Sequence, residues 1–130
     1  TEELFDWARV LAWCPPIQGP SIAILTNAGG LGVIAADAVE NYGLVLADLT
    51  PQTQADLRSL LPPAASVYNP VDMLGSATPE QYASCLKILI TDPCVHGILI
   101  IIPPPPVRSA EEIAQAIITG LPRLTVICAD

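Results

Sequence analysis

Apolar residues gather in five short runs along the chain, and the stretches between the runs carry apolar residues at helical spacing. The runs predict five β-strands, at residues 21–26, 44–49, 65–68, 97–102 and 124–128. The fourth run, from Gly97 to Ile102, is apolar without interruption, which is typical of a strand buried on both faces of a sheet.

Start and stop signals mark the helices between these strands. Thr50 followed by proline opens a predicted helix at 51–61, and capping boxes at 78–81 and 109–112 open helices at 79–91 and 110–120. A helix over about 33–42 ends at Gly43, which suits a left-handed C-terminal residue. One further helix, over residues 2–13, precedes the first strand.

Strands that alternate with helices predict the α/β class with a parallel sheet. We expect a flavodoxin-like three-layer sandwich, with a five-stranded parallel sheet in the order 2-1-3-4-5 and an extra N-terminal helix. Residues 1–19 form that helix and a linker, and residues 20–130 form the domain. Ligands bind beyond the carboxyl ends of such strands, so the loops at 26–32 and 69–76 should be neighbours at the ligand edge.

Composition narrows the classes of function. The 130 residues suit one domain, and 52% are hydrophobic and 14% charged, too apolar for a disordered chain. A net charge of −8 argues against a nucleic-acid partner. No run approaches the roughly 20 apolar residues of a membrane span, so no membrane partner is expected. With no secretory signal visible, we expect a cytoplasmic protein.

The cysteines and the single histidine suggest no metal site. The four cysteines lack metal-ligand spacing and are predicted to be buried thiols: Cys14, Cys85, Cys94 and Cys128. His96 precedes the fourth strand, at the end of the sheet away from the ligand edge, and is predicted to be a surface-loop histidine. No serine or cysteine has a histidine partner, so the chain by itself shows no catalytic residues.

The segment Thr26–Val33 (TNAGGLGV) is the strongest candidate for chemistry. It lies between the first strand and a helix, and three of its residues are glycines. A helix that begins after such a turn presents free N–H groups to an anion, most often a phosphate. The segment matches neither the P-loop nor the Gly-x-Gly-x-x-Gly pattern, since residue 35 is alanine. The other interpretation, that the glycines only let helix and strand pack closely, stays open.

Asn69-Pro70-Val71-Asp72 follows the third predicted strand and also has two interpretations. Asn69 and Asp72 could line a pocket at the ligand edge. Their side chains could instead bond to nearby backbone and hold the loop, which the turn chemistry favours.

Several motifs together carry a resemblance to a known family. TNAGGLGV is followed in order by Ala36-Asp37-Ala38, LLPPAA at 60–65, Asn69-Pro70-Val71-Asp72, and DPCVHG at 92–97. With these motifs, residues 20–130 resemble the succinyl-CoA-synthetase-like flavodoxin domain of the NDP-forming acyl-CoA synthetases, in particular the ADP-forming acetate–CoA ligases.

The resemblance implies one domain of a multidomain enzyme that converts acid, CoA and ATP into acyl-CoA, ADP and phosphate through a phosphohistidine. CoA, ATP or ADP and Mg²⁺ would serve the full-length enzyme, and this fragment alone would hold no cofactor. Its partners would be the phosphohistidine loop of the preceding domain and an ATP-grasp domain or subunit, with homo-oligomers also conceivable.

Carried over by position, Asn27, Gly29, Gly30 and Gly32 would form a phosphate-binding cradle at the helix N-terminus. The phosphorylated histidine would belong to the preceding domain, so His96 is not that residue. Leu31 stands where the family commonly has proline. The chain stops after the last predicted strand, where the family has a further helix, so we expect a fragment that is inactive alone.

Two other functions fit the same fold. The domain could belong to the ligase-like regulatory part of a fused protein lysine N-acetyltransferase. It could also be a free-standing flavodoxin-like module, although the expected loop aromatics are missing apart from Tyr68, and the only lysine, Lys87, lies inside a predicted helix.

Overall fold

The computed structural model describes residues 4, 8, 12, 16–103 and 109–120 of the chain. The elements in order are β1 (Ser21–Thr26), α2 (Gly29–Asn41), β2 (Val45–Leu46), α3 (Pro51–Leu60), β3 (Val71–Asp72), α4 (Pro79–Ile90), β4 (Gly97–Ile101) and α5 (Ala110–Gly120). Of the predicted N-terminal helix, only Leu4, Ala8 and Ala12 are described, and they are helical and exposed. The predicted strand at 124–128 lies outside the described residues.

All described strands run parallel to β1, which is the centre of the sheet. β4 pairs with one edge of β1 along five positions, from Ile22 opposite Gly97 to Thr26 opposite Ile101. β2 pairs with the start of β1 and β3 with its end. On the side of β2 and β3, the bonded carbonyls of β1 include those of Ile22 and Thr26. These residues are an even number of positions apart, so their carbonyls point to the same edge of the strand. β2 and β3 therefore share the edge of β1 opposite β4.

The predicted strand order is therefore wrong for the described strands. An order of 2-1-3-4-5 puts the third strand between the first and the fourth, whereas β4 lies directly beside β1. The third strand is also misplaced. Residues 65–68 form only an isolated antiparallel bridge, Ser66 to Asp72, and the pairing strand is Val71–Asp72. The run at 65–68 fails as a parallel strand because the chain turns back on itself at Asn69 and Pro70.

The side chain of Asn69 fills the gap between β2 and β3. Its Oδ1 accepts the N–H of Ile24 at 2.9 Å, and its Nδ2 donates to the carbonyls of Ile22 at 2.7 Å and Ala47 at 3.0 Å. Ile24 is fully buried, so its N–H would otherwise be an unpaired donor in the core. The side-chain amide of Asn69 thus makes the hydrogen bonds that the backbone of a neighbouring strand would otherwise make.

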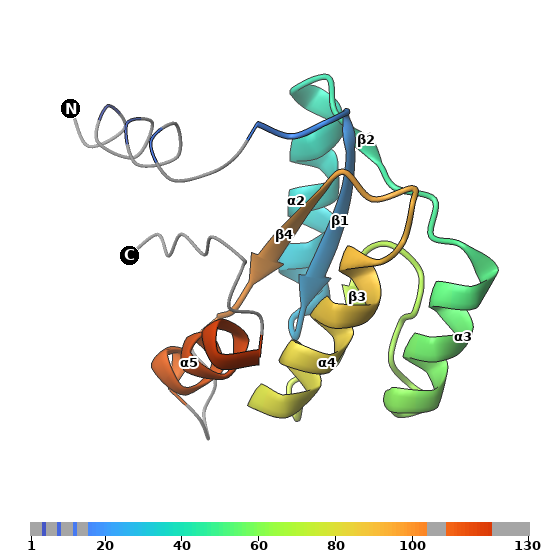
Figure 1. Ribbon diagram of the computed structural model, residues 1–130, viewed down its shortest axis with the longest axis vertical. Coiled ribbons are helices and arrows are strands. Elements are labelled where there is room, and N and C mark those ends of the chain that lie inside the picture. The colour runs from blue at the N-terminus through green and yellow to red at the C-terminus, as the bar shows by residue number, and fades with distance from the viewer. Residues whose placement is uncertain (1–3, 5–7, 9–11, 13–15, 104–108, 121–130) are drawn as a thin grey trace.

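Helices cover both faces of the sheet unequally (Figure 1). The larger core cluster, with seventeen buried residues, lies on the side of α3, α4 and α5, where Leu57, Leu86 and Ile113 are fully buried. The smaller cluster has three, Ile22, Ile24 and Val39, beneath α2. Among the described residues, the α2 side of the sheet is therefore the thinly covered one.

Two burial predictions are corrected by the structure. β4 is not buried on both faces: Leu99 is 42% exposed, because it lies on the thinly covered side in register with Ile24. Among the cysteines, Cys85 is buried as predicted but Cys94 is exposed, since it lies in the loop between α4 and β4. Cys14 and Cys128 fall outside the described residues.

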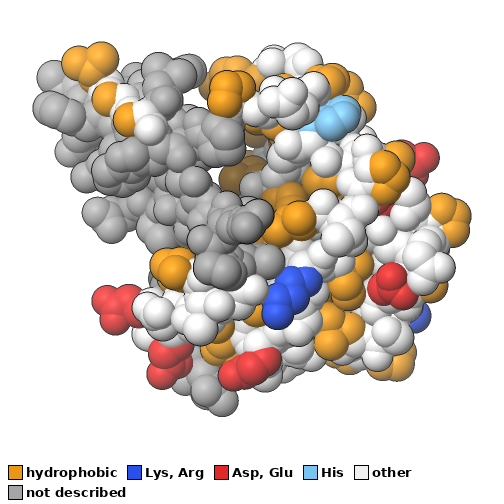
Figure 2. All heavy atoms as spheres, viewed as in Figure 1, with side chains coloured by type: hydrophobic (Ala, Val, Ile, Leu, Met, Phe, Trp, Pro, Cys, Tyr) orange, Lys and Arg blue, Asp and Glu red, His pale blue; other side chains and the backbone are white. Residues whose placement is uncertain are grey.

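Carboxylates dominate the charged surface. Figure 2 shows acidic side chains along the lower part of the molecule, over the region where α4 and α5 begin in Figure 1. No helix in the described part of the chain is long and apolar enough to span a membrane.

The bridging amide leads to a stability prediction. Asn69→Ala should lower the free energy of unfolding by about 2–4 kcal/mol, since it leaves the Ile24 N–H and neighbouring carbonyls without a partner. Urea denaturation measures this change. Asn41→Ala, at the exposed end of α2, is the control and should change the value by less than about 0.5 kcal/mol. Equal effects of the two substitutions would contradict the bridging role.

Candidate functional site

The candidate anion site lies where β1 ends and α2 begins. α2 starts at Gly29, earlier than the predicted residue 33, so the glycines lie in the first turn of the helix and not in a turn before it. Ala28 is the N-cap and supplies no side-chain cap. The N–H of Ala28 donates to the Thr26 hydroxyl, and that of Gly32 donates to the Ala28 carbonyl. The N–H groups of Gly29, Gly30 and Leu31 have no acceptor among the described residues.

The three glycines serve different purposes. A Cβ on Gly32 would lie 3.1 Å from the Thr26 methyl and 3.3 Å from Pro70 Cβ, so this glycine allows close packing of helix, strand and loop. A Cβ on Gly29 would lie 2.6 Å from Asp72 Oδ2. A Cβ on Gly30 would meet nothing within 4 Å, so the space in front of this residue is open. Gly32 therefore fits the packing interpretation of the glycine segment, and Gly30 leaves the open space that the phosphate interpretation needs.

These contacts also bring together the two loops that the sequence predicted to be neighbours. Gly29 and Gly32 meet Asp72 and Pro70, so the α2 start and the Asn69–Asp72 loop share the carboxyl edge of β1. The prediction of a common edge is confirmed, although the strand order behind it was wrong.

Asp72 places a carboxylate beside the first turn of α2. Its Oδ1 accepts the N–H of Leu74 at 2.9 Å, and its Oδ2 faces Gly29. Leu74 has a φ of 69°, in the left-handed region that costs a leucine roughly 1–2 kcal/mol, and the bond from Asp72 supports that turn. The charge of Asp72 lowers the positive potential of the helix end on this side and leaves the side at Gly30 free.

Two buried polar atoms near this edge have no hydrogen-bond partner among the described residues: Asn27 Oδ1 and the hydroxyl of Tyr82. Asn27 is 7% exposed and lies between the last residue of β1 and the N-cap of α2. Burial, and to a smaller extent the neighbouring Asp72 and Cys85, raises the pKa of Tyr82 far above its ordinary value. The hydroxyl therefore stays protonated, as a donor inside the fold. The sequence alone gives no signal for Tyr82, because a tyrosine at this position fits the apolar face of a helix.

The other described helices begin with a side-chain acceptor for one N–H group of the first turn. Thr78 caps α4 in the predicted capping box with Gln81, and the acidic Glu80 lies in the same first turn. In α5 the Ser109 hydroxyl accepts the N–H of Glu112, and two glutamates occupy the first turn. Among the described helices with an assigned N-cap, only α2 lacks a side-chain cap.

The start of α3 shows how a carboxylate can occupy a helix end. Thr50 caps it, and Asp92 Oδ2 accepts the Thr50 N–H at 2.9 Å. Burial alone would raise the pKa of Asp92, but hydrogen bonds from Thr53, Cys94 and Thr50 outweigh it and hold the pKa below its usual range. This end of α3 is therefore closed to an external anion.

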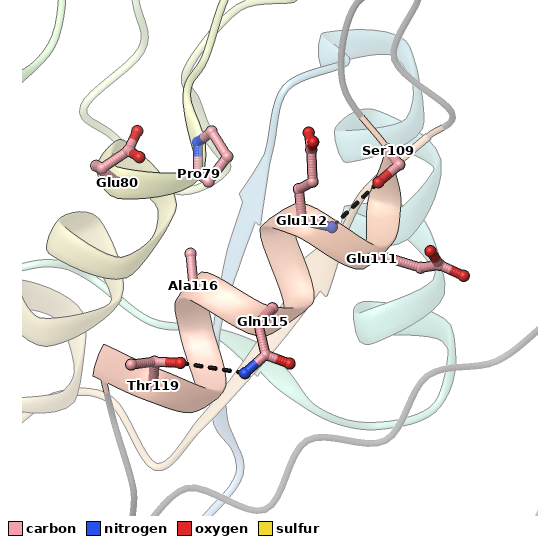
Figure 3. A pocket seen from close by; sticks show the side chains of 8 residues that line it. All are labelled: Pro79, Glu80, Ser109, Glu111, Glu112, Gln115, Ala116 and Thr119. Carbon is pink, nitrogen blue, oxygen red and sulfur yellow. Dashed lines mark hydrogen bonds between the residues drawn. The ribbon is translucent and has the colours of Figure 1, made fainter.

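An open groove of about 780 Å³ lies between the start of α4 and one side of α5 (Figure 3). Its carboxylates are Glu80, Glu111 and Glu112, and no residue of α2 lines it. Acidic walls do not suit a phosphate or a nucleotide. The described residues contain no group of three or more His, Cys, Asp or Glu side chains that could hold a metal ion.

The remaining candidate residues are engaged in contacts within the fold. The amide of Asn69 is fully engaged with the sheet backbone, as the loop-holding interpretation expects. His96 lies at the amino end of the sheet, as predicted. Its backbone N–H donates to the Ser21 carbonyl, and its ring Nδ1 accepts the Ser21 N–H. Burial raises the pKa of the Cys85 thiol to about 12, so this thiol is not a nucleophile near neutral pH.

The fold and this edge define an α/β domain whose central parallel strand ends at an uncapped helix. A family model described as "Ligase-CoA domain" matches residues 22–120. The chain therefore belongs to the Ligase-CoA domain family.

Relatives in this family are ADP-forming ligases. The chain is 42% identical over 122 residues to the alpha subunit of acetate–CoA ligase (ADP-forming) II of Pyrococcus furiosus, covering 89% of this chain and 26% of the relative. It is 38% identical over 117 residues to acetate–CoA ligase (ADP-forming) I of Archaeoglobus fulgidus, covering 90% of this chain and 17% of the relative. The chain thus spans about a quarter or less of the length of these relatives.

A solved structure has the same fold. It is an acetyl-coenzyme A synthetase 1 of Candidatus Korarchaeum cryptofilum, described as dinucleotide forming, in complex with phosphate and ADP. The TM-score is 0.83 at 28% identity, covering 94% of this chain and 26% of that chain. The resemblance inferred from the motifs is confirmed.

The glycine contacts predict unequal effects of the same substitution. Gly30→Ala should leave the free energy of unfolding unchanged or raise it by up to about 1 kcal/mol, because the methyl enters open space in a helix. Gly29→Ala should lower it by about 1–3 kcal/mol, because the methyl must displace the Asp72 carboxylate from its bond to Leu74. Urea denaturation of both variants checks the pair, and indistinguishable effects would show that Asp72 does not hold this position.

Proposed function

We propose that this chain is one domain of an ADP-forming acyl-CoA ligase, in which the N-terminus of α2 stabilises a phosphorylated histidine from another domain. The observation that carries the proposal is the free helix end, where three backbone N–H groups have no acceptor among the described residues, at the carboxyl edge of the central strand. The ligase names of the relatives support this function over the acetyltransferase alternative.

Backbone donors suit a phosphoryl group that must be held and then passed on. The N–H groups of Gly29, Gly30 and Leu31 can bond to phosphoryl oxygens, and the helix dipole adds about half a positive charge. The described first turn of α2 contributes no lysine or arginine that would hold the phosphoryl group by a full charge. Asn27, Gly29, Gly30 and Gly32 remain the proposed cradle, with Gly32 as its packing residue, and Asp72 lines one side.

The cofactors of the reaction are proposed to bind in other domains. The described residues offer no metal-ligand group for Mg²⁺, and their open groove is acidic, which does not fit ATP or the phosphates of CoA. The proposed role of this chain is to bind and orient the phosphoryl group, while an ATP-grasp domain or subunit supplies the nucleotide site. We propose a cytoplasmic location, because CoA and ATP are the expected co-substrates.

We also propose that residues 124–128 add a fifth parallel strand beside β4. The outer edge of β4 pairs with no described strand. An unpaired apolar edge is a site for strand addition, and the segment Leu124–Cys128 is itself apolar. In the intact protein, the amides of 124–128 should exchange with deuterium about as slowly as those of β4. Exchange at the rate of an unfolded peptide would argue against the fifth strand.

A single substitution tests the phosphate cradle. Gly30→Asp places a carboxylate in the open space before the helix end. Two unit charges about 4 Å apart repel by about 4 kcal/mol at an effective dielectric constant of about 20, so phosphohistidine formation in the full-length enzyme should fall at least about 100-fold. The measurement is the rate and extent of histidine phosphorylation by ATP.

The matched controls separate charge from folding. Gly30→Asn has nearly the same size without the charge, and Gly30→Ala tests the methyl alone, so both should retain most of the phosphorylation. Gly30→Asp itself should not lower the free energy of unfolding, since an acidic residue in a first turn is favoured by about 0.3–1 kcal/mol. Normal phosphorylation in a folded Gly30→Asp enzyme would sink the cradle hypothesis.

A further inference from the structure

Two buried polar atoms of complementary kind have no hydrogen-bond partner among the described residues. The Oδ1 atom of Asn27 can only accept a hydrogen bond, and the hydroxyl of Tyr82 can donate one. Tyr82 is fully buried, and Asn27 is 7% exposed. Buried polar groups without a partner are rare, because each has lost its bonds to water without replacing them. We therefore asked whether these two groups can satisfy each other.

The side chains of Asn27 and Tyr82 lie on the same side of the sheet. Side chains alternate along β1, so that Ile24 belongs to the smaller core cluster beneath α2 and Leu25 to the larger cluster. Asn27 comes directly after β1 and continues this alternation, so its side chain leaves the chain on the side of the larger cluster. Tyr82 is a member of that cluster.

The hydroxyl of Tyr82 reaches the carboxyl edge of the sheet. Tyr82 lies in the first turn of α4, and Asp72 adds to the burial that raises its pKa, so the Asp72 carboxylate is a neighbour of the hydroxyl. Asp72 is in register with Thr26, the last residue of β1. Asn27 follows Thr26 in the chain. The Asn27 side chain and the Tyr82 hydroxyl therefore share Asp72 as a common neighbour at this edge.

We propose that Tyr82 is a positioning residue for Asn27: its hydroxyl donates to Asn27 Oδ1, and this bond holds the amide N–H groups of Asn27 toward the phosphate cradle. The proposal rests on the function proposed above and adds a residue that acts on the cradle from inside the core. Neither group is bonded to the other in this structure, so closing the contact requires a side-chain rotation. That rotation satisfies both groups at once.

The orientation of the Asn27 amide decides whether this residue attracts or repels an anion. Its Nδ2 has no bond to the described residues and is not enclosed, so Nδ2 is the amide atom that reaches the ligand edge. In the reverse orientation, Oδ1 would face the cradle and repel a phosphoryl oxygen. The Tyr82 hydroxyl opposes that orientation, because its single proton would then face the amide N–H groups and have no acceptor there.

Asp72 is the rival acceptor for the Tyr82 hydroxyl. Its Oδ1 already accepts the N–H of Leu74, and the residue is only partly buried, so water can satisfy its remaining lone pairs. Asn27 Oδ1 is enclosed and has no such access to water. A hydrogen bond from Tyr82 therefore gains more at Asn27 than at Asp72.

A double-mutant cycle in the full-length enzyme tests the proposal, with the rate of histidine phosphorylation by ATP as the readout. Tyr82→Phe keeps the ring and removes only the hydroxyl, and it should lower the rate about tenfold. In an Asn27→Ala background the same substitution should change the rate less than about twofold, since the amide that the hydroxyl positions is absent. Equal factors in the two backgrounds, or no effect of Tyr82→Phe, would overturn the proposal.

Two further variants serve as controls. In an Asp72→Asn background, Tyr82→Phe should keep its full effect on the rate. An effect that disappears there and persists in Asn27→Ala would assign the hydroxyl to Asp72 and overturn the proposal. Tyr42→Phe removes the hydroxyl of a tyrosine that is 86% exposed at the end of α2, and it should leave the rate unchanged.

A crystal structure of the full-length enzyme separates this proposal from the phosphate cradle, because it needs no activity. The Tyr82 hydroxyl oxygen should lie about 2.8 Å from Asn27 Oδ1, and a separation beyond hydrogen-bond distance would overturn the positioning role. The bond in an enzyme that tolerates Gly30→Asp would refute the cradle and keep the Tyr82–Asn27 pair. Loss of phosphorylation in Gly30→Asp without that bond would keep the cradle and refute the pair.

Discussion

The ligand edge of this domain depends on the amide of Asn69. β2 leaves β1 after two paired residues, and β3 meets it only near its end, so the middle of the strand has no neighbour on that edge. Asn69 supplies the missing donor and acceptor there, to Ile22, Ile24 and Ala47. Because the amide is anchored, two later residues of the loop reach α2: Pro70 packs on Gly32, and Asp72 faces Gly29. The loop that the amide fixes thus shapes one wall of the candidate phosphate cradle.

The cradle itself combines two opposing electrostatic contributions. Free N–H groups and the helix dipole attract an anion, and the nearby Asp72 carboxylate partly offsets them. An environment of this kind holds a phosphoryl group less tightly than a lysine-bearing loop does. Weak holding suits a site whose group must move on to another carrier, as in the proposed ligase. The acidic starts of α4 and α5 leave the end of α2 as the favoured place for that group.

Two parts of the described surface are apolar and exposed. Leu99 of β4 and the α2 residues Leu31, Val33 and Ile34 are apolar and exposed, and Leu99 lies on the face of the sheet that α2 covers. A domain that makes up about a quarter of its relative is expected to complete its packing with the rest of that chain. The proposed fifth strand assigns the outer edge of β4 to residues 124–128.

The sequence by itself determined the α/β class, the ends of most helices and the family. These depend on local signals such as Thr50-Pro51, the capping box at Thr78 and Gly43 with its φ of 75°, which act within a few residues of the chain. It also predicted that the glycine segment and the Asn69–Asp72 loop share an edge. The sequence alone could not give the pairing of β4 with β1, the bridging amide of Asn69, or the separate tasks of Gly29, Gly30 and Gly32. Those depend on contacts between residues far apart in the chain, such as the 45 positions between Asn69 and Ile24, and only the tertiary structure decides which groups meet.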